Sequence, residues 1–181
     1  MPAAFIEAVF ATMNEVSQHT FQVLTKRPER VRALESRLWW TPNIWLGVSI
    51  ESEQWLERLG PLTATGARTK FLSLEPLLGP IPGLDLSGID WVIAGGESGP
   101  RARPMQVEWV RSIRDTCVRG EVPFFFKQWG GVFKKRTGRT LDGRTWDQMP
   151  AVAAGTCKAV PYRAVARRSS AGAPTRMPSA P

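Results

Sequence analysis

The stretch IWLGVSIES (residues 44–52) decides the fold class, because an apolar, β-rich run ends there in a carboxylate and a hydroxyl. Four other runs have the same design: TFQVLTK (20–26), KFLSLEP (70–76), DWVIAGGES (90–98) and VPFFFKQWG (122–130). A buried strand requires its apolar middle, but it does not require a charge at its end. In parallel α/β folds the carboxyl edge of the sheet is where binding and chemistry occur. The pattern therefore predicts one polar site assembled from five separated segments.

The polar residues and glycines at these five strand ends form the candidate site. Each has a structural alternative, because a carboxylate and an amine at a sheet edge can neutralise each other, and paired glycines can serve a tight turn. We expect the set to bind a substrate or cofactor, and the sequence assigns no catalytic role and no metal to any member. The candidate binding residues are Lys26, Ser49, Glu51, Glu75, Gly95, Gly96, Glu97, Ser98, Arg101, Lys127, Gln128 and Trp129.

Amphipathic segments separate most of the predicted strands. Periodicity predicts helices over residues 3–16 and 105–119, and Pro28 and Ser52 mark the starts of two more, the first reaching residue 39. Strand starts recur about every 20–32 residues, the length of a βα unit. The sequence therefore predicts an α/β fold with a parallel sheet of about five βα units. Five strands are too few for a closed eight-stranded barrel, so the sheet is open or forms an incomplete β/α barrel of the TIM type.

The composition of the chain changes near residue 150. Residues 151–181 are rich in Ala, Pro, Ser and Arg and hold five basic side chains and no acid, whereas residues 1–150 hold 19 basic and 16 acidic side chains. Over half of the formal charge of +8 therefore belongs to the tail. We expect residues 1–150 to form one domain and residues 151–181 to be a disordered basic tail. A nucleic-acid partner is compatible with this charge, but net charge alone does not establish one.

Composition also excludes several classes of protein. No apolar run approaches the ~20 residues that a membrane helix requires, and Glu7 interrupts an N-terminal segment that no basic flank precedes. We therefore expect no membrane partner, no signal peptide and a cytoplasmic location. Cys117 and Cys157 have no second cysteine or histidine at metal-ligand spacing, so we expect no metal or cofactor in this chain. Cys117 falls in a predicted helix and is expected to be a small buried residue.

The segment GGESG (95–99) is the sharpest local motif. Glycines that follow a strand allow a ligand to approach the backbone, and Glu97 could accept a hydrogen bond from an amine, hydroxyl or amide. A tight turn in which Glu97 caps the loop is an equally good explanation. Arg101 and Arg103 could bind a carboxylate or phosphate, and could equally be solvated. Periodic segments predict packing roles for Trp39, Trp40, Trp45, Trp55, Trp91, Trp109 and Trp146.

Six motifs, in this order and spacing, resemble a phage- and prophage-associated family of largely uncharacterised proteins. That family is similar to the radical S-adenosylmethionine enzymes and has a partial β/α barrel. The resemblance covers roughly residues 3–150. Its motifs are FQVLTKRPER (21–30), PNIWLGVSIES (42–52), FLSLEPLLGPI (71–81), DWVIAGGESGPRARPM (90–105), VPFFFKQWG (122–130) and GRTLDGRTWDQMP (138–150).

The resemblance implies a [4Fe–4S] cluster and S-adenosylmethionine in full-length members, with the cluster held by an N-terminal motif of the form CxxxxxGCxxCY. This chain has no such motif, so it resembles the C-terminal part of such an enzyme, and we expect it to lack radical activity. The strand-end residues would then line the substrate and cofactor side of the barrel mouth. The edge left by the missing strands would be open to a partner chain or to aggregation.

Two other functions compete with this interpretation. Four basic residues after the last strand, together with the basic tail, would serve a non-catalytic nucleic-acid-binding module: Lys134, Lys135, Arg136 and Arg139. Alternatively, three carboxylates could support a hydrolase or lyase with magnesium or manganese, because these ions prefer oxygen ligands: Glu51, Glu75 and Glu97. The spacing of these carboxylates gives the hydrolase no positive signature, and no pattern in the sequence identifies a substrate.

Overall fold

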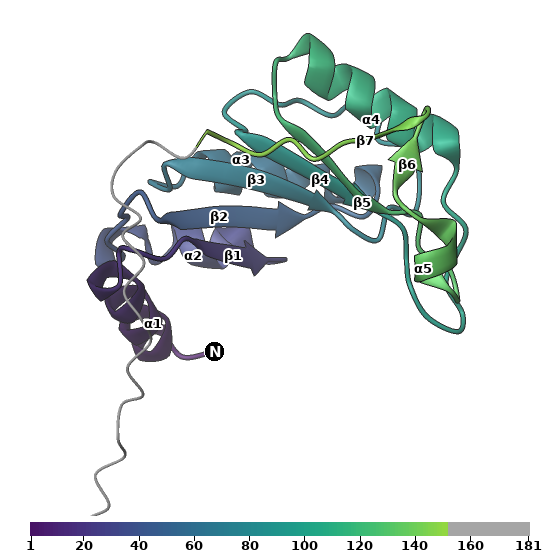
Figure 1. The fold of residues 1–181 in the computed structure, drawn as a ribbon. Coiled ribbons are helices and arrows are strands. Elements are labelled where there is room, and N and C mark those ends of the chain that lie inside the picture. The colour runs from purple at the N-terminus through teal and green to yellow at the C-terminus, as the bar shows by residue number, and fades with distance from the viewer. Residues whose placement is uncertain (152–181) are drawn as a thin grey trace, which may run out of the picture.

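The computed structural model describes residues 1–151, apart from the side chains of Lys134 and Lys135. A five-stranded, all-parallel sheet forms the centre of the described part (Figure 1). The strands follow chain order: β1 (Phe21–Thr25), β2 (Ile44–Ser49), β3 (Thr69–Leu74), β4 (Trp91–Gly95) and β5 (Phe124–Gln128). The predicted α/β class and parallel sheet are confirmed. An order without reversal matches a segment of a β/α barrel, because a doubly wound sheet reverses its order at a switch point.

Helices cover one face of this sheet, as Figure 1 shows for α2, α3 and α4. In the main core, Leu62 of α3 and Ile113 of α4 pack with alternate strand residues such as Leu72. Sequential right-handed crossovers place every connecting helix on the same side, which explains this one-sided cover. The helices are α1 (Ala3–Glu15), α2 (Pro28–Arg32), α3 (Leu59–Thr63) and α4 (Val107–Arg119), with the 3₁₀ helices η1 (Glu35–Arg37) and η2 (Glu53–Arg58).

The prediction of one continuous helix over residues 28–39 is wrong, although the segment buries apolar side chains on one face as a helix would. The chain forms α2 and then η1, although Leu34 and Leu38, four residues apart, are both buried. The Glu35 carboxylate accepts a hydrogen bond of 2.6 Å from the backbone N–H of Gly66, so this segment is fixed to the loop after α3. A contact over 31 residues is not visible in local periodicity.

The predicted helix from Ser52 also differs from the structure. Ser52 provides no side-chain cap, and η2 forms first, with a new α-helix beginning at Leu59. Pro61 lies in the first turn of α3, where its missing N–H breaks no hydrogen bond. By contrast, the amphipathic prediction for residues 105–119 agrees closely with α4, which buries Val110 and Cys117.

The uncovered face of the sheet changes in character along the strands. Its amino half carries an aromatic cluster, in which the Trp45 and Trp91 rings meet edge to face at 6.1 Å and Phe71 packs beside them. The next layer is formed by Ser49 and Ser73, which face each other in the β2–β3 register and are buried. Charged side chains follow at the strand ends. The predicted gradient from an apolar middle to a polar end therefore occurs on the face that has no helices.

Gly47 allows the aromatic cluster to form. The two residues Gly47 and Phe71 are partners in the parallel register, and a Cβ at position 47 would lie 2.6 Å from Phe71 Cδ2. The Phe71 ring therefore occupies the space that a side chain on β2 would fill. The glycine is required here for close approach rather than for an unusual backbone conformation.

The two outer strands of the sheet, β1 and β5, differ in what lies beside them. Beyond β5, the segment after the hairpin β6 (Thr140–Leu141) and β7 (Arg144–Thr145) runs antiparallel: Phe126 N–H donates to Trp146 O at 2.9 Å, and Gln148 N–H to Phe124 O at 3.2 Å. The hairpin includes the Asp142–Gly143 turn, with both residues at positive φ, which Asp-Gly pairs adopt readily. At the other edge, no strand within residues 1–151 pairs with the outer side of β1.

Most of the predicted packing roles of the tryptophans agree with their burial, but the one for Trp39 is wrong. Trp45, Trp91 and Trp146 are buried, whereas 74% of Trp39 is exposed. Trp39 follows η1, and its backbone carbonyl accepts a hydrogen bond from Asn14.

In residues 1–151 no helix has the length and apolar character needed to cross a membrane. The predicted disordered tail begins at residue 151, and its residues 152–181 lie outside the described part of the chain.

Candidate functional site at the carboxyl edge

The carboxyl ends of the strands bring the predicted charged residues to one edge, where they form two separate groups. In the first, Lys26 after β1 pairs with Glu51 after β2. Arg58 of η2 also reaches Glu51, at 3.1 Å, and donates a hydrogen bond of 2.6 Å to the backbone carbonyl of Ser49. In the second, Lys127 of β5 lies 3.0 Å from Glu75, which follows β3.

Glu51 is the most buried of these carboxylates, with 6% of the residue exposed. Burial alone would raise the pKa of Glu51, but the hydrogen bond and charge of Lys26, together with the charge of Arg58, hold it below its ordinary value. Arg58 is itself buried and stacks on Trp55, with 4.0 Å between its guanidinium carbon and the ring centroid. This group therefore joins the ends of β1 and β2, and the buried Ser49 is held to it through the hydrogen bond from Arg58 to its carbonyl.

The second group crosses an intervening strand. Glu75 and Lys127 come from β3 and β5, and Gly95 at the end of β4 lies between them. A Cβ on Gly95 would lie 3.0 Å from Glu75 Oε2 and 3.1 Å from Gln128 Nε2. The absence of a side chain at Gly95 therefore allows the carboxylate and the ammonium to meet across β4.

An open pocket of about 390 Å³ surrounds this pair. Glu75 forms a shielded wall, since 15% of its side chain is exposed, and Lys127 stands at the rim with 56% exposed. Gln128 uses its amide N–H to hold the Gly96 carbonyl at 3.2 Å, so its side chain is partly committed to the structure. The pocket is lined by Glu75, Pro76, Gly96, Glu97, Ser98, Lys127 and Gln128.

The GGESG motif packs closely against the backbone that follows β5. A Cβ on Gly96 would overlap the Trp129 carbonyl oxygen and lie 2.7 Å from its carbon. Gly130, at φ +80°, meets the Glu97 backbone in the same way, and Gly131 N–H donates to the Glu97 carbonyl at 2.7 Å. The backbones after β4 and β5 are thus in close contact, which explains Gly96 and Gly130.

Glu97 forms an ion pair with Arg103, which the sequence analysis gives as a candidate anion-binding residue. Arg103 donates two side-chain hydrogen bonds of 2.8 and 2.9 Å to the carboxylate, and its backbone N–H donates a third of 2.9 Å. These hydrogen bonds lower the pKa of Glu97 to about 2. Glu97 therefore caps its own loop, as the structural alternative for this motif predicts, while one side of it still faces the pocket.

Beyond the first charge group, Arg101 and Trp129 are also absent from the pocket lining. Arg101 is exposed and forms no ion pair with any residue from 1 to 151. Trp129 packs its ring on Phe126, at 4.8 Å between centroids, and donates from Nε1 to the Thr140 carbonyl at 2.9 Å. Arg58 was missed by the sequence analysis, although its position seven residues after Glu51, beside Trp55, was the available signal.

The comparisons with known proteins identify one family. Residues 1–150 match the family model described as "Protein of unknown function (DUF5131)". The chain belongs to the DUF5131 family. No curated protein and no solved structure matches it. Membership of an uncharacterised family, which the sequence motifs indicated, is therefore confirmed.

The donor set of this DUF5131 chain does not fit the [4Fe–4S] cluster that the resemblance implies. A cluster requires several thiolates, and the thiol of Cys117 is fully buried in α4. Burial raises the pKa of Cys117 to about 12, which keeps this thiol protonated. No three His, Cys, Asp or Glu side chains within residues 1–151 lie close enough to share a metal ion.

The carboxylate hydrolase also finds no support in the described part of the DUF5131 chain. Each of the three carboxylates proposed for it is bound by a different cation: Glu51 by Lys26 and Arg58, Glu75 by Lys127, and Glu97 by Arg103. A divalent ion held by oxygen ligands requires carboxylates that face one another. Here they face lysine and arginine instead.

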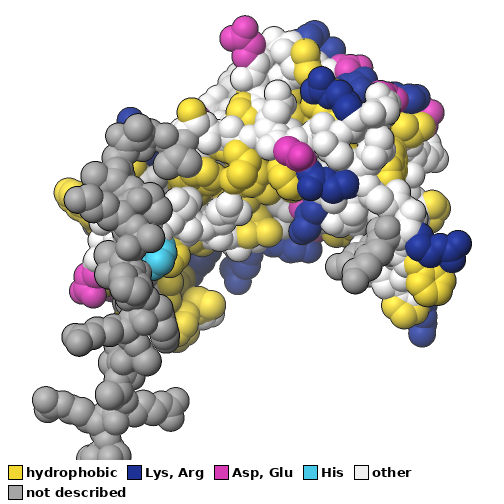
Figure 2. Space-filling view, in the orientation of Figure 1, with side chains coloured by type: hydrophobic (Ala, Val, Ile, Leu, Met, Phe, Trp, Pro, Cys, Tyr) yellow, Lys and Arg dark blue, Asp and Glu magenta, His cyan; other side chains and the backbone are white. Residues whose placement is uncertain are grey.

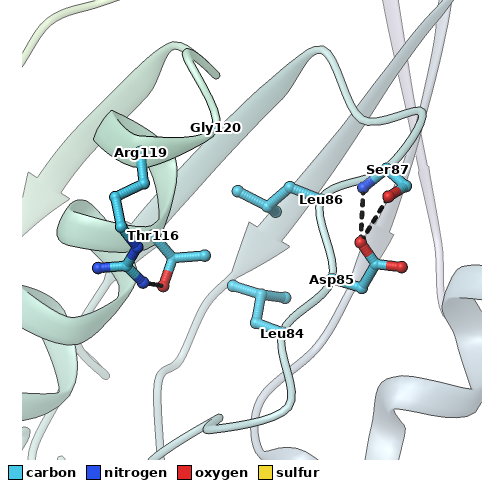
Figure 3. Close-up of a pocket in the computed structure, with 7 residues that line it drawn as sticks. All are labelled: Leu84, Asp85, Leu86, Ser87, Thr116, Arg119 and Gly120. Carbon is cyan, nitrogen blue, oxygen red and sulfur yellow. Dashed lines mark hydrogen bonds between the residues drawn. The ribbon is translucent and has the colours of Figure 1, made fainter.

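A second pocket lies at the opposite, amino edge of the sheet (Figure 3). It has a volume of about 420 Å³ and is bounded by the loop before β4 and the end of α4. Asp85 accepts hydrogen bonds from the backbone and hydroxyl of Ser87, and Arg119 donates to Thr116 at 3.1 Å. Figure 3 shows these pairs on opposite walls, with Leu84 and Leu86 between them.

Proposed function

We propose that this DUF5131 chain supplies the ligand-binding carboxyl edge of a radical-SAM-like β/α barrel. The pocket at Glu75 and Lys127 would bind the amino-acid moiety of S-adenosylmethionine. The observation that carries this proposal is the Glu75–Lys127 pair across Gly95, because it places one anion and one cation 3.0 Å apart in an accessible pocket. The sequential parallel sheet and the resemblance of the motifs support the same assignment.

A zwitterionic ligand is the chemical match for such a pair. Its ammonium group would replace Lys127 at the shielded Glu75 carboxylate, and its carboxylate would meet the exposed Lys127 ammonium. The Ser98 hydroxyl and the Gln128 amide, both on the pocket wall, can accept or donate to the rest of the ligand. The residues thus act in binding, and none is assigned a catalytic step.

Radical chemistry is not part of this proposal for the chain alone. The 181 residues contain two cysteines, fewer than the three thiolates that the family motif supplies. Any cluster next to this pocket would therefore need ligands from another polypeptide segment. The link with phages and prophages is likewise a proposal, and the genes that flank this one would test it.

Calorimetric titration of the purified chain with S-adenosylmethionine tests the binding proposal. We expect saturable binding that Glu75→Gln weakens at least tenfold, because a charge-assisted hydrogen bond is worth about 1.5–3 kcal/mol. Lys127→Gln should weaken binding of S-adenosylmethionine and of methionine, but not of adenosine. Asp85→Asn, in the amino-edge pocket, is the matched control and should leave the affinity unchanged. Absence of binding at millimolar ligand, or equal affinity in Glu75→Gln, would overturn the assignment.

The open edge of β1 supports a further part of this proposal, in which a strand from a partner chain pairs there. Half of the Leu24 side chain is exposed on this edge strand, and unpaired strand edges attract other strands. Light scattering across a range of protein concentrations would show self-association if the partner is a second copy. Leu24→Lys should then reduce it, and a monomer at every concentration would exclude a second copy.

A further inference from the structure

We propose that residues 131–139, here called the basic tip, bind single-stranded nucleic acid. The basic tip follows β5 and contains the short helix α5 (Lys134–Thr137). Figure 1 shows α5 projecting from the carboxyl end of β5, away from the helices that cover the sheet. This inference does not depend on the nature of the ligand in the Glu75–Lys127 pocket.

The basic tip is anchored at both ends. At its start, Gly131 donates to the Glu97 carbonyl at 2.7 Å and accepts from Gly99 N–H at 3.3 Å. At its end, Trp129 N–H donates to the Gly138 carbonyl at 3.1 Å, and the Thr137 hydroxyl donates to the Gly130 carbonyl at 2.7 Å. Hydrogen bonds therefore close the backbone of the basic tip at both ends.

Exposed apolar side chains form the apex of the basic tip. Phe133 is 65% exposed and Val132 is 57% exposed, so neither side chain belongs to the buried core. The guanidinium carbon of Arg136 lies 5.9 Å from the centroid of the Phe133 ring, so a cation accompanies the aromatic face. At the lower right of Figure 2, yellow hydrophobic atoms lie directly beside dark blue basic ones, in the region that Figure 1 labels α5.

The charge of the basic tip has a single sign. The segment contains four basic residues and no Asp or Glu: Lys134, Lys135, Arg136 and Arg139. Arg139 is not available to a ligand, because it pairs with Asp147 and lies over the Phe125 ring at 5.0 Å. Arg136 forms no ion pair within residues 1–151. The tip therefore offers an aromatic ring, an adjacent guanidinium and two lysines in the sequence between them.

This combination matches single-stranded nucleic acid. Proteins that bind it stack bases on exposed aromatic side chains and track the phosphates with Lys and Arg. A base can stack on the free face of Phe133, while the phosphates on either side meet the basic side chains. A lipid surface fits less well, because two apolar side chains bury little area and stable membrane binding needs more than one weak anchor.

The test is fluorescence anisotropy with a fluorescein-labelled 20-mer of thymidine and the full chain at 50 mM and 200 mM salt. We expect Phe133→Ala to weaken binding about fivefold or more, since stacking on an aromatic side chain is worth about 1–3 kcal/mol per base. Phe5→Ala is the matched control, because Phe5 is 54% exposed on α1 and should not matter. The double variant Lys134→Gln, Lys135→Gln should reduce the salt dependence of binding.

Several outcomes would overturn this inference. The full chain carries five more basic residues after position 150, and these could bind nucleic acid by charge alone. In that case Phe133→Ala and Phe5→Ala would bind equally well. Binding to vesicles of anionic lipid without binding to the oligonucleotide would assign the tip to membranes instead. Thermal unfolding of Phe133→Ala should match the wild type, which separates a lost contact from a lost fold.

Discussion

The two edges of the sheet carry pockets of similar size, about 390 Å³ at the carboxyl edge and about 420 Å³ at the amino edge, but their polar groups are connected differently. At the amino edge, Asp85 binds Ser87 and Arg119 binds Thr116, so each polar group is satisfied within its own segment. At the carboxyl edge, Glu75 and Lys127 come from strands that are not neighbours. Only the carboxyl edge depends on the folded arrangement of several strands.

This difference separates a pocket whose polar groups are joined by the sheet from one whose polar groups are joined within single segments. At the amino edge the hydrogen bonds join residues two or three positions apart in the sequence, and none of them crosses from one wall of the pocket to the other. A charge pair joined across a glycine on the intervening strand requires the sheet, and an accessible ammonium and carboxylate can exchange partners with a ligand. The amino edge of the sheet in parallel α/β folds commonly serves stability, in agreement with this assignment.

Among the variants that test the comparison of the two edges, we expect Gly96→Ala at the carboxyl edge to lose the most stability. The added methyl group would overlap the backbone of Trp129, which cannot move without separating β4 from β5. We expect a loss of about 3 kcal/mol or more in the free energy of unfolding, at or beyond the upper end for overpacked sites. Urea denaturation measures this loss.

Gly60→Ala is the matched control for this substitution. No heavy atom lies within 4 Å of the Cβ that it would add, and the residue sits in α3. Alanine in a helix is about 0.5–1 kcal/mol more favourable than glycine, so this variant should be neutral or stabilised. Equal stability of the Gly96→Ala and Gly60→Ala variants would contradict the tight joining of the β4 and β5 ends.

A smaller loss is expected from Glu51→Gln, in the buried group of the same edge. The substitution removes the charge that Lys26 and Arg58 share, and Arg58 is buried while Lys26 is 62% exposed. Breaking a buried ion pair costs about 3–5 kcal/mol, and we expect about 2–3 kcal/mol here because water partly screens Lys26. Urea denaturation at pH 7 provides the measurement.

An exposed carboxylate of the same type is the control for Glu51. Glu29 pairs with Arg27, and both side chains are more than half exposed, so Glu29→Gln should cost less than about 1 kcal/mol. If both variants lose the same stability, the burial of Glu51 does not strengthen its ion pairs, and the first charge group would not fix the strand ends.

The fold could be predicted from the sequence because its signals are local. Each strand combines an apolar run with a polar end, and the periodicity of α4 places Val110, Ile113 and Cys117 on one buried face, as observed. The failures occurred where a distant contact decides the backbone. Glu35 binds Gly66 across 31 residues and ends the helical segment early, and no window of the local sequence contains that information.

The candidate site could be predicted only in part, for the same reason. The strand ends correctly indicated which charged residues lie at one edge, but not which of them pair. The partner of Glu97 proved to be Arg103, six residues away, and the partner of Glu75 proved to be Lys127, two strands away. The glycines of the GGESG motif were ambiguous in sequence, because their reason is the backbone of Trp129 and Gly130.

The smallest expected effect is on the pH dependence of stability. It is measured for one carboxylate at each edge, Glu97 at the carboxyl edge and Asp85 at the amino edge. Arg103 holds the pKa of Glu97 at about 2, below its ordinary value of 4.5, so the ionised form stabilises the folded state. This stabilisation is complete above pH 4.5 and is lost as the pH falls through the window between 4.5 and about 2. Glu97→Gln should therefore lower the melting temperature at pH 7, and the difference from the wild type should shrink progressively towards pH 3.

Asp85→Asn is the amino-edge counterpart of Glu97→Gln. Hydrogen bonds from the backbone and the hydroxyl of Ser87 lower the pKa of Asp85, but no cation among residues 1–151 pairs with it, and an asparagine carbonyl can accept the same hydrogen bonds. Its melting temperature should thus stay closer to the wild type at every pH. A larger effect for Asp85 than for Glu97 would reverse the ranking of the two edges, since it would mean that the bonds within one loop outweigh the charge pairs that the folded carboxyl edge assembles.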